Sequence, residues 1–404
     1  QMMTLRAGYA LGDKTNIGLE WALSNRDYNT FSDRDDQDDR GMATFLTLQH
    51  WQPIRRDSGR TVALEVTANY EWAGARFELV ENYRPMEFTR DWNTTGLAIR
   101  NDQHLVRSLV QLTGQQFGQA GYGLSTYQIP GQYSGLKHAF VANLNVGKWR
   151  YTSQSTYLTS EGQGISTAYL RPTMELSRSL PLLNAWRGGV GYMQEDNRIR
   201  PTASDSLLGS SFGFREWRFF LRSADTSAIP LEARYVARID RLPVLGRLPI
   251  NNRGNTFYLN GAILTLPKQQ IRWTMTYRQL RYVDSTTATG QDEQTALGRL
   301  QYSLTALKGL VRSNTLYEVG TGQEPRREFA FVRVPEGQGN YIWNDDGDGV
   351  QELAEFEIAS ENDAVFANYI RVFTPTRDFV RTNIAQLNQV LELRPAALFT
   401  GDKK

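Results

Sequence analysis

The chain of 404 residues contains no cysteine. Disulfide bonds, thiolate metal sites and a cysteine nucleophile are therefore excluded. The lack of disulfides is compatible with many locations in the cell, so it constrains the chemistry of the protein more than its compartment.

Long apolar runs are also missing. No stretch approaches the roughly 20 uninterrupted apolar residues of a membrane-spanning helix. The mean hydropathy is -0.49 and 40% of the residues are hydrophobic, which is too polar for a helical membrane protein. The 19 Tyr, 18 Phe and 9 Trp exclude the opposite extreme, because a disordered chain carries few aromatic residues.

Neither sign of charge is in large excess. The chain has 45 Lys and Arg against 43 Asp and Glu, a formal net charge of +2, and the two signs are interspersed. A basic stripe that could neutralise a phosphate backbone is not found, so nucleic acid is not an expected partner.

The dominant pattern is an alternation of apolar and polar residues with a period of two. In residues 62–72, Val, Leu, Val, Ala, Tyr and Trp occupy the even positions, and the odd positions are polar apart from Ala63. About eleven alternating residues match a tilted transmembrane β-strand. Similar segments lie at residues 17–24, 41–51, 105–113, 117–127, 139–147, 149–158, 166–177, 213–221, 231–239, 256–264, 271–282 and 379–393.

The connections between these segments tend to alternate between short and long. Short ones are expected at residues 12–15, 53–60, 114–116, 148, 223–230 and 267–270, and longer ones at 29–40, 74–103, 128–136, 195–212, 240–255 and 283–293. In an up-and-down barrel, tight turns face the periplasm and longer loops face outside. We therefore predict an all-β fold: an up-and-down antiparallel transmembrane β-barrel, partial, of about 16–17 strands, with long extracellular loops.

The main alternative is a soluble β-sandwich or propeller, whose strands also alternate in polarity. Strands of a sandwich average about five or six residues and need no regular alternation of loop length. The predicted strands are nearer ten residues, and aromatic residues such as Trp21, Trp51, Trp72 and Trp149 recur at their ends, as in the girdles of a barrel.

One local motif carries a recognisable chemistry. Residues 344–355 fit the spacing of a calcium-binding loop, with oxygen ligands at positions one, three and five, Gly349 at six and a glutamate at twelve. Oxygen-only ligands favour Ca2+ over zinc or copper. The predicted ligands are the side chains of Asn344, Asp346 and Asp348, the carbonyl of Val350, Glu352 directly or through water, and Glu355.

An acidic Asp-Gly turn without metal is the alternative, because Asn at the first position lowers the ligand charge. The flanking segments lack the paired amphipathic helices of a calcium sensor, so a structural role is expected for the ion. We predict three parts: barrel strands in 1–319, a cap or plug excursion in 320–378 that contains the calcium-type loop, and a further barrel strand in 379–404.

Two regions also resemble a known group of proteins. Residues 339–343 (Gly-Asn-Tyr-Ile-Trp), 355–359 (Glu-Phe-Glu-Ile-Ala) and 369–376 (Tyr-Ile-Arg-Val-Phe-Thr-Pro-Thr) form one region, and residues 83–93 (Tyr-Arg-Pro-Met-Glu-Phe-Thr-Arg-Asp-Trp-Asn) form the other. The chain resembles large, mostly uncharacterised outer-membrane proteins of Bacteroidota, which are Gram-negative bacteria. The resemblance implies an outer-membrane location and a longer parent protein. The absence of a signal peptide and of a terminal aromatic residue agrees with an internal fragment.

Catalytic residue sets are not apparent. The three histidines, His50, His104 and His138, are accompanied by neither a Gly-x-Ser-x-Gly elbow nor a His-Glu-x-x-His zinc pair, and each is expected at an interface or in a lumen. We therefore expect no enzyme, but an outer-membrane barrel that acts in passage, assembly or surface anchoring. Its expected partner is the lipid bilayer, and protein partners are not predictable. The alternative is a soluble or surface-attached β-rich binding module with calcium-stiffened loops.

Overall fold

The computed structural model describes residues 1–26, 39–57, 60–79, 83–180, 186–224, 227–283, 292–345, 347, 349, 351–360 and 363–395. Within its strands, the side chains of residues 56, 57, 60, 322–329 and 373–381 lie outside this description. In these ranges, no helix combines the length and the apolarity that crossing a bilayer requires.

The described residues form twenty strands and four short helices. The strands are β1 (Met2–Leu11), β2 (Thr15–Asn25), β3 (Arg40–Asp57), β4 (Arg60–Ala73), β5 (Gln103–Gly114), β6 (Gly118–Ile129), β7 (Tyr133–Val146), β8 (Trp149–Gly162), β9 (Ile165–Arg171), β10 (Thr173–Leu180), β11 (Trp186–Pro201), β12 (Phe212–Arg222), β13 (Leu231–Arg241), β14 (Ile250–Ile263), β15 (Gln269–Tyr282), β16 (Glu293–Ala306), β17 (Val311–Arg333), β18 (Tyr341–Trp343), β19 (Phe356–Ile358) and β20 (Tyr369–Leu393). The helices are α1 (Phe88–Asp91) and the 3-10 turns η2 (Leu307–Gly309), η3 (Leu353–Glu355) and η4 (Ala364–Phe366).

All twenty strands belong to one antiparallel sheet. β9 and β10 both pair with β8 and β11, so they occupy one position that is interrupted at Pro172, which has no N–H to donate to the ladder. β18 and β19 form a small separate hairpin. Seventeen strand positions therefore lie side by side in the described residues, which confirms the predicted all-β class and strand number.

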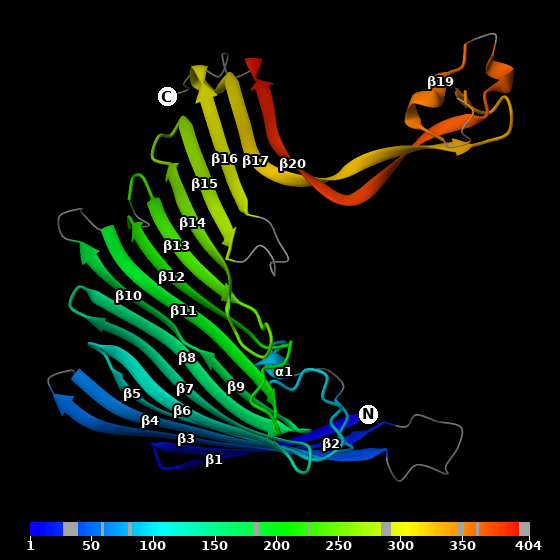
Figure 1. Cartoon of the computed structure of the whole chain (residues 1–404). Helices are drawn as coiled ribbons and strands as arrows, with labels where there is room; N and C mark the ends of the chain where they lie inside the picture. Colours follow the sequence, from blue (N-terminus) through cyan, green and yellow to red (C-terminus); the bar gives the residue numbers. More distant parts are fainter. Residues whose placement is uncertain are drawn as a thin grey trace.

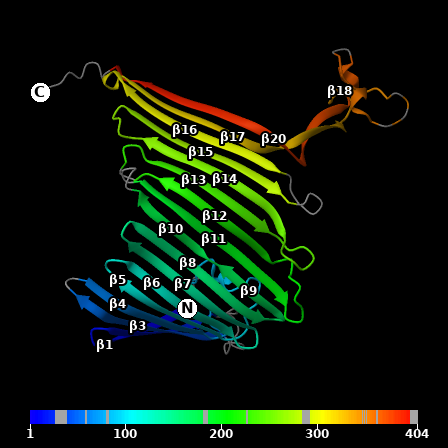
Figure 2. The ribbon, with the colours of Figure 1, turned by 60° about the vertical axis from the view of Figure 1, so that its left-hand side comes forward.

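The sheet is strongly curved, and its two edges are not paired with each other. Within the described ranges β1 pairs only with β2, and β20 pairs with β17 and, at Tyr369 alone, with β18. Figures 1 and 2 show the strands following one another in chain order from β1 to β20 around a concave space.

Continuous antiparallel register places the alternating residues of all strands on common faces. We call one side the apolar face; it carries, strand by strand, Leu5, Trp21, Leu46, Tyr70, Val106, Tyr122, Phe140, Tyr157, Leu176, Val190, Phe219, Tyr235, Phe257, Met275, Leu300, Tyr317 and Leu387. The opposite side, the polar face, carries ion pairs within and between strands, such as Arg6–Glu20 at 2.6 Å.

Short and long connections alternate as predicted, with three exceptions. One is the connection 242–249, on the side of the long ones, which has eight residues and is no longer than the short connection 223–230. The connections 130–132 and 163–164 lie on the side of the long ones but are tight turns, so the predicted long loop at 128–136 is wrong. Gly131, with φ of 72°, permits the first of these turns, and Ile129 pairs directly with Tyr133. The predicted loop at 195–212 is also shorter, because β11 continues to Pro201.

β17 and β20 extend beyond the rest of the sheet as a two-stranded ribbon. Their pairing continues to Arg333 and Tyr369, with a register shift between Pro325 and Arg327. The ladder thus continues beyond residue 320, and residue 378 lies within the register shift, whereas 320 and 378 were predicted as boundaries of a separate excursion. Figure 1 shows the ribbon leaving the sheet with β18 and β19 at its far end. We call residues 334–368 the ribbon tip.

Candidate functional site on the polar face and in the acidic loop

The long connection between β4 and β5, residues 74–102, lies on the polar face. The backbone of residues 76–77 crosses Gly41 so closely that an added Cβ would lie 2.2 Å from the carbonyl oxygen of Arg76. The N–H of Glu78 then donates a hydrogen bond of 3.0 Å to the hydroxyl of Ser24, which is 2% exposed. Figure 1 shows α1, which belongs to this connection, inside the curve of the sheet, so the polar face is the concave one.

Glu71 in β4 binds the connection at Tyr83 and Arg84. Its carboxylate accepts a hydrogen bond from Arg84 at 2.6 Å and another from the hydroxyl of Tyr83, and Arg107 lies 3.5 Å away. Burial and the hydrogen bond to Glu71 raise the pKa of Tyr83 to about 12. Burial alone would lower the pKa of Arg84, but the hydrogen bond and the charge of Glu71 hold it above its ordinary value. The connection is therefore tied to the sheet by a buried, paired charge.

An apolar cluster follows at α1. Phe88 and Trp92 are 9% and 2% exposed, and they pack on Tyr127, with ring centroids 5.3 and 5.5 Å apart. The hydroxyl of Tyr133 donates to the carbonyl of Trp92, and the ammonium of Lys137 lies 4.3 Å from the centre of the Trp92 ring. The cluster also contains Leu105, Ile129, Leu158 and Tyr169, all from the polar face of β5 to β9.

The same helix reaches the strands on the far side of the cluster. Asp91 pairs with Arg171 of β9 at 2.6 Å, and Arg90 pairs with Glu195 of β11 at 2.5 Å. The amides of Asn93 and Asn197 exchange two hydrogen bonds, at 3.0 and 2.8 Å. One connection thus holds contacts from β2 to β11 across the concave side.

This placement differs from the expected outward loop, and the sequence did contain a signal for it. Residues 77–92 include Phe77, Leu79, Phe88 and Trp92, which a fully solvated loop would not need. Phe88 and Trp92 lie in the second resemblance motif, at residues 83–93. Periodicity alone cannot reveal the inward path, because the segment alternates with neither strand nor helix period.

The three histidines lie on the apolar face and not on the polar face. The Nδ1 atom of each is within hydrogen-bond distance of a hydroxyl from the neighbouring strand. The pairs are Thr15–His50 at 2.8 Å, Tyr70–His104 at 3.0 Å and Tyr122–His138 at 2.5 Å. They come from three separate places in the sheet, so they do not combine into a catalytic set.

The predicted calcium loop lies at the ribbon tip, and half of its ligands can be located. Asn344, Glu352 and Glu355 are described, whereas Asp346, Asp348 and Val350 lie outside the described residues. The Glu355 carboxylate accepts hydrogen bonds from the Trp343 indole at 2.7 Å and from the N–H of Glu352 at 3.1 Å. The N–H of Asn344 donates to the Glu355 carbonyl at 2.9 Å, which brings the first and last positions of the loop together.

Asp345, outside the predicted ligand set, organises the turn itself. Its carboxylate accepts hydrogen bonds from the N–H groups of Gly347 and Gly349 at 3.1 and 3.0 Å. Both glycines have positive φ, 106° and 69°, which other residues rarely adopt. Over the described part of the chain no three His, Asp or Glu side chains gather as metal ligands, and three of the predicted ligands lie outside that part, so the calcium site stays a prediction.

Comparison with known proteins gives no assignment: no family model matches the chain, and no curated protein matches it.

Replacing Trp92 by Ala is predicted to release the connection from the sheet. Removal of a buried Trp side chain reduces stability by about 3–5 kcal/mol. Here the loss would weaken the binding of residues 83–97 to the sheet. Trypsin should then cut after Arg90 or Arg100 much faster than in the wild type; Arg84 precedes Pro85 and is not a trypsin site. Met86→Ala, at a side chain 93% exposed in the same connection, is the matched control and should stay protected. Equal protection of both variants would contradict the docked arrangement.

Calcium is predicted to protect the ribbon tip. Gathering the carboxylates of the loop without a cation costs on the order of 1 kcal/mol for each close like-charge pair, even in water. Proteolysis of residues 334–368 should slow with Ca2+ and accelerate with a chelator, and Glu355→Gln should remove the difference. Glu357→Gln is the matched control, since Glu357 accepts a hydrogen bond from the Asn344 side chain at 3.1 Å but lies outside the predicted ligand set. If calcium and chelator give the same cleavage in every sample, the loop is an acidic turn.

Proposed function

We propose that the chain forms part of the wall of an outer-membrane β-barrel, with the apolar face toward lipid and the polar face toward the lumen. In this proposal the protein acts in passage, assembly or surface anchoring, and not in catalysis. The resemblance to outer-membrane proteins of Bacteroidota supports the location.

The observation that carries the proposal is one continuous, solvent-exposed apolar face. Leu5, Tyr122, Phe257, Met275 and Leu387, from strands spread between β1 and β20, are 61%, 51%, 52%, 53% and 64% exposed. Soluble monomers rarely expose contiguous apolar patches of more than a few hundred Å2. A face of this kind, over strands of ten or more residues, fits contact with hydrocarbon.

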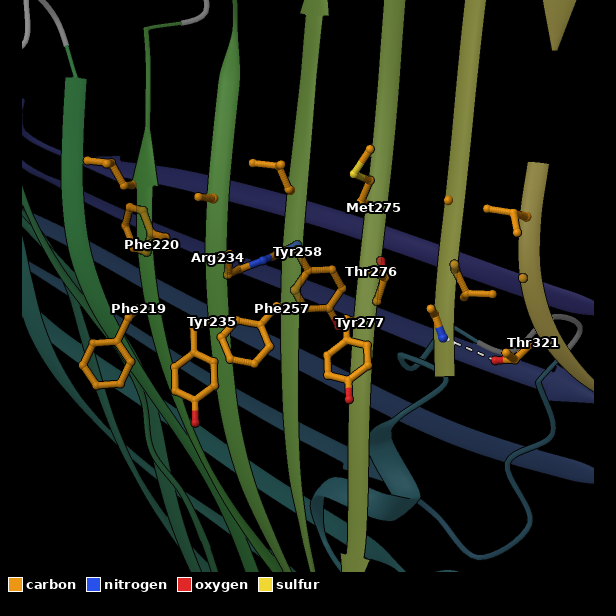
Figure 3. A pocket seen from close by; sticks show the side chains of 18 of the residues that line it. Phe219, Phe220, Arg234, Tyr235, Phe257, Tyr258, Met275, Thr276, Tyr277 and Thr321 are labelled. Carbon is orange, nitrogen blue, oxygen red and sulfur yellow. Dashed lines mark hydrogen bonds between the residues drawn. The ribbon is translucent and has the colours of Figure 1, made fainter. Parts of the chain in front are cut away.

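Aromatic rings form a row on this face between β12 and β15. Phe219, Tyr235, Phe257 and Tyr277 pair across neighbouring strands, with successive ring centroids 6.3, 4.7 and 6.5 Å apart. Figure 3 shows the four rings side by side. They help to line an open depression of about 910 Å3. Exposed aromatic rows are typical of lipid-facing barrel surfaces.

The polar face supports the second half of the proposal. Arg218 lies 3.1 Å from Glu216, and Arg238 lies 2.9 Å from Asp240 and 3.8 Å from Glu216. These charges would be costly against lipid but are stable against water, as in a hydrated lumen.

The odd number of strand positions limits how the two edges of the sheet can be joined into a closed barrel. With seventeen alternating positions, β1 and β20 run in the same direction, so direct pairing between them would be parallel. Single-chain bacterial barrels are antiparallel with an even number of strands. We infer that an odd number of further strands completes the wall between the two edges, which would otherwise be unprotected.

The alternative is a soluble or surface-attached β-rich binding module whose loops are stiffened by calcium. The ribbon and its tip favour it, because they place the acidic loop far from the sheet (Figure 2). A soluble module would stay monodisperse without detergent, whereas a barrel wall would aggregate.

Charge on the apolar face is predicted to block membrane assembly. Arg or Lys at the lipid-facing midplane of a barrel costs about 2–4 kcal/mol, whereas a lumen position costs much less. Leu64, paired with Leu112 on the apolar face, and Thr67, paired with Leu109 on the polar face, allow a comparison within one strand. In full-length protein, Leu64→Arg should reduce the folded, protease-resistant fraction in the outer membrane, and Thr67→Arg should not. Equal assembly of the two variants would argue against the assigned faces and against the membrane.

A further inference from the structure

The polar face contains a recess whose lining is mostly apolar. It has a volume of about 570 Å3 and lies between β1–β5 and the connection that folds over them. Ala22, Ala43 and Phe45 line it from the sheet, and Phe77 and Leu79 line it from the connection. A recess of this size and polarity matches sites that bind one small molecule, in which a few polar groups orient an apolar body.

Among the described residues in and beside the recess, three guanidinium groups accompany two carboxylates. Glu20 is already paired with Arg6 at 2.6 Å. Glu71 is shared by two guanidinium groups, Arg84 at 2.6 Å and Arg107 at 3.5 Å. Arg84 is 14% exposed and outside the lining, whereas Arg107 is 42% exposed and lines the recess.

We propose that this recess binds an amphiphile with one unbranched apolar chain and one carboxylate, whose carboxylate pairs with Arg107. The planar guanidinium of arginine matches a carboxylate in two parallel hydrogen bonds. Each methylene buried against Phe45, Phe77 and Leu79 raises the affinity by about fourfold. A cationic head group is disfavoured because both carboxylates of the recess are already paired, and a two-chain lipid exceeds its volume.

Binding is tested with decanoate and with 1-decanol, which has the same chain and no charge. Fluorine-labelled forms of both are titrated by 19F NMR against the protein in a neutral maltoside detergent. The partition of each probe into protein-free micelles is measured separately, and affinities are expressed against the free probe concentration. The wild type should bind decanoate about tenfold or more tighter than decanol, as expected for a charge-assisted hydrogen bond. Equal affinity for the two probes would overturn the proposal.

Arg107→Gln should abolish the preference for decanoate while leaving decanol binding within about twofold, the scatter usual among single-site effects. Glu71 keeps Arg84, so the connection should stay docked, as checked by its resistance to trypsin. Arg299→Gln is the matched control: Arg299 is on the same face, 51% exposed and 3.5 Å from Glu318. If Arg107→Gln and Arg299→Gln behave alike, Arg107 does not hold the carboxylate.

Ala43→Trp tests the recess itself, because the indole fills it without changing any charge. This variant should lose both probes, whereas Ala237→Trp, the same substitution on the apolar face of β13, should keep both. Retained binding in Ala43→Trp would place the ligand elsewhere. The outcome does not depend on membrane insertion, so it can fail while the proposed barrel stands, and the reverse.

Discussion

Backbone hydrogen bonding in antiparallel register organises everything else in this molecule. Because each strand pairs residue by residue with the next, a single-residue slip anywhere would exchange the apolar and polar faces of every later strand. The register is continuous from β1 to β20, with few shifts, among them one between Pro53 and Arg55 in β3. A period of two in the sequence is thereby converted into two chemically distinct surfaces. One is exposed and apolar, and the other holds paired charges.

Much of this architecture can be read from the sequence, and the reason is local. Alternation in residues 62–72 or 271–282 depends on neighbouring residues only, and strand length follows from how far it persists. The tight turn at 130–132 was not predicted from the sequence. Gln128 and Leu136 belong to the two strands beside it, and these strands end on buried residues, whereas a cluster of polar residues would have marked a turn. Which loop turns inward was not predictable either. The contacts of Trp92 with Tyr127 and Tyr133 join residues 35 or more positions apart, and no local pattern encodes such pairs.

In the acidic loop, the sequence signal is strong, but it does not identify which residues organise the turn. Its spacing is a strong local signal, and in the structure the N–H of Asn344 donates to the carbonyl of Glu355. The same signal did not reveal that Asp345 accepts two glycine N–H groups, because both an Asp-Gly turn and a calcium loop need acidic residues followed by glycines. The inward connection and the recess beneath it lie in a segment with no alternation. In that segment, the sequence feature that indicated burial was the presence of aromatic residues in a predicted loop.

The ribbon of β17 and β20 also determines how mechanical load would enter the sheet. Its two strands are the direct continuation of the last pair of the wall, hydrogen-bonded from Val311–Leu393 to Arg333–Tyr369. A pull on the tip along the ribbon therefore acts in shear on many backbone hydrogen bonds at once, and a sideways pull opens them singly from the tip inward. The register shift beside Pro325 divides the ladder, so sideways opening meets a discontinuity before it reaches the edge of the sheet. The ribbon is therefore expected to resist a force along its axis more strongly than a force across it.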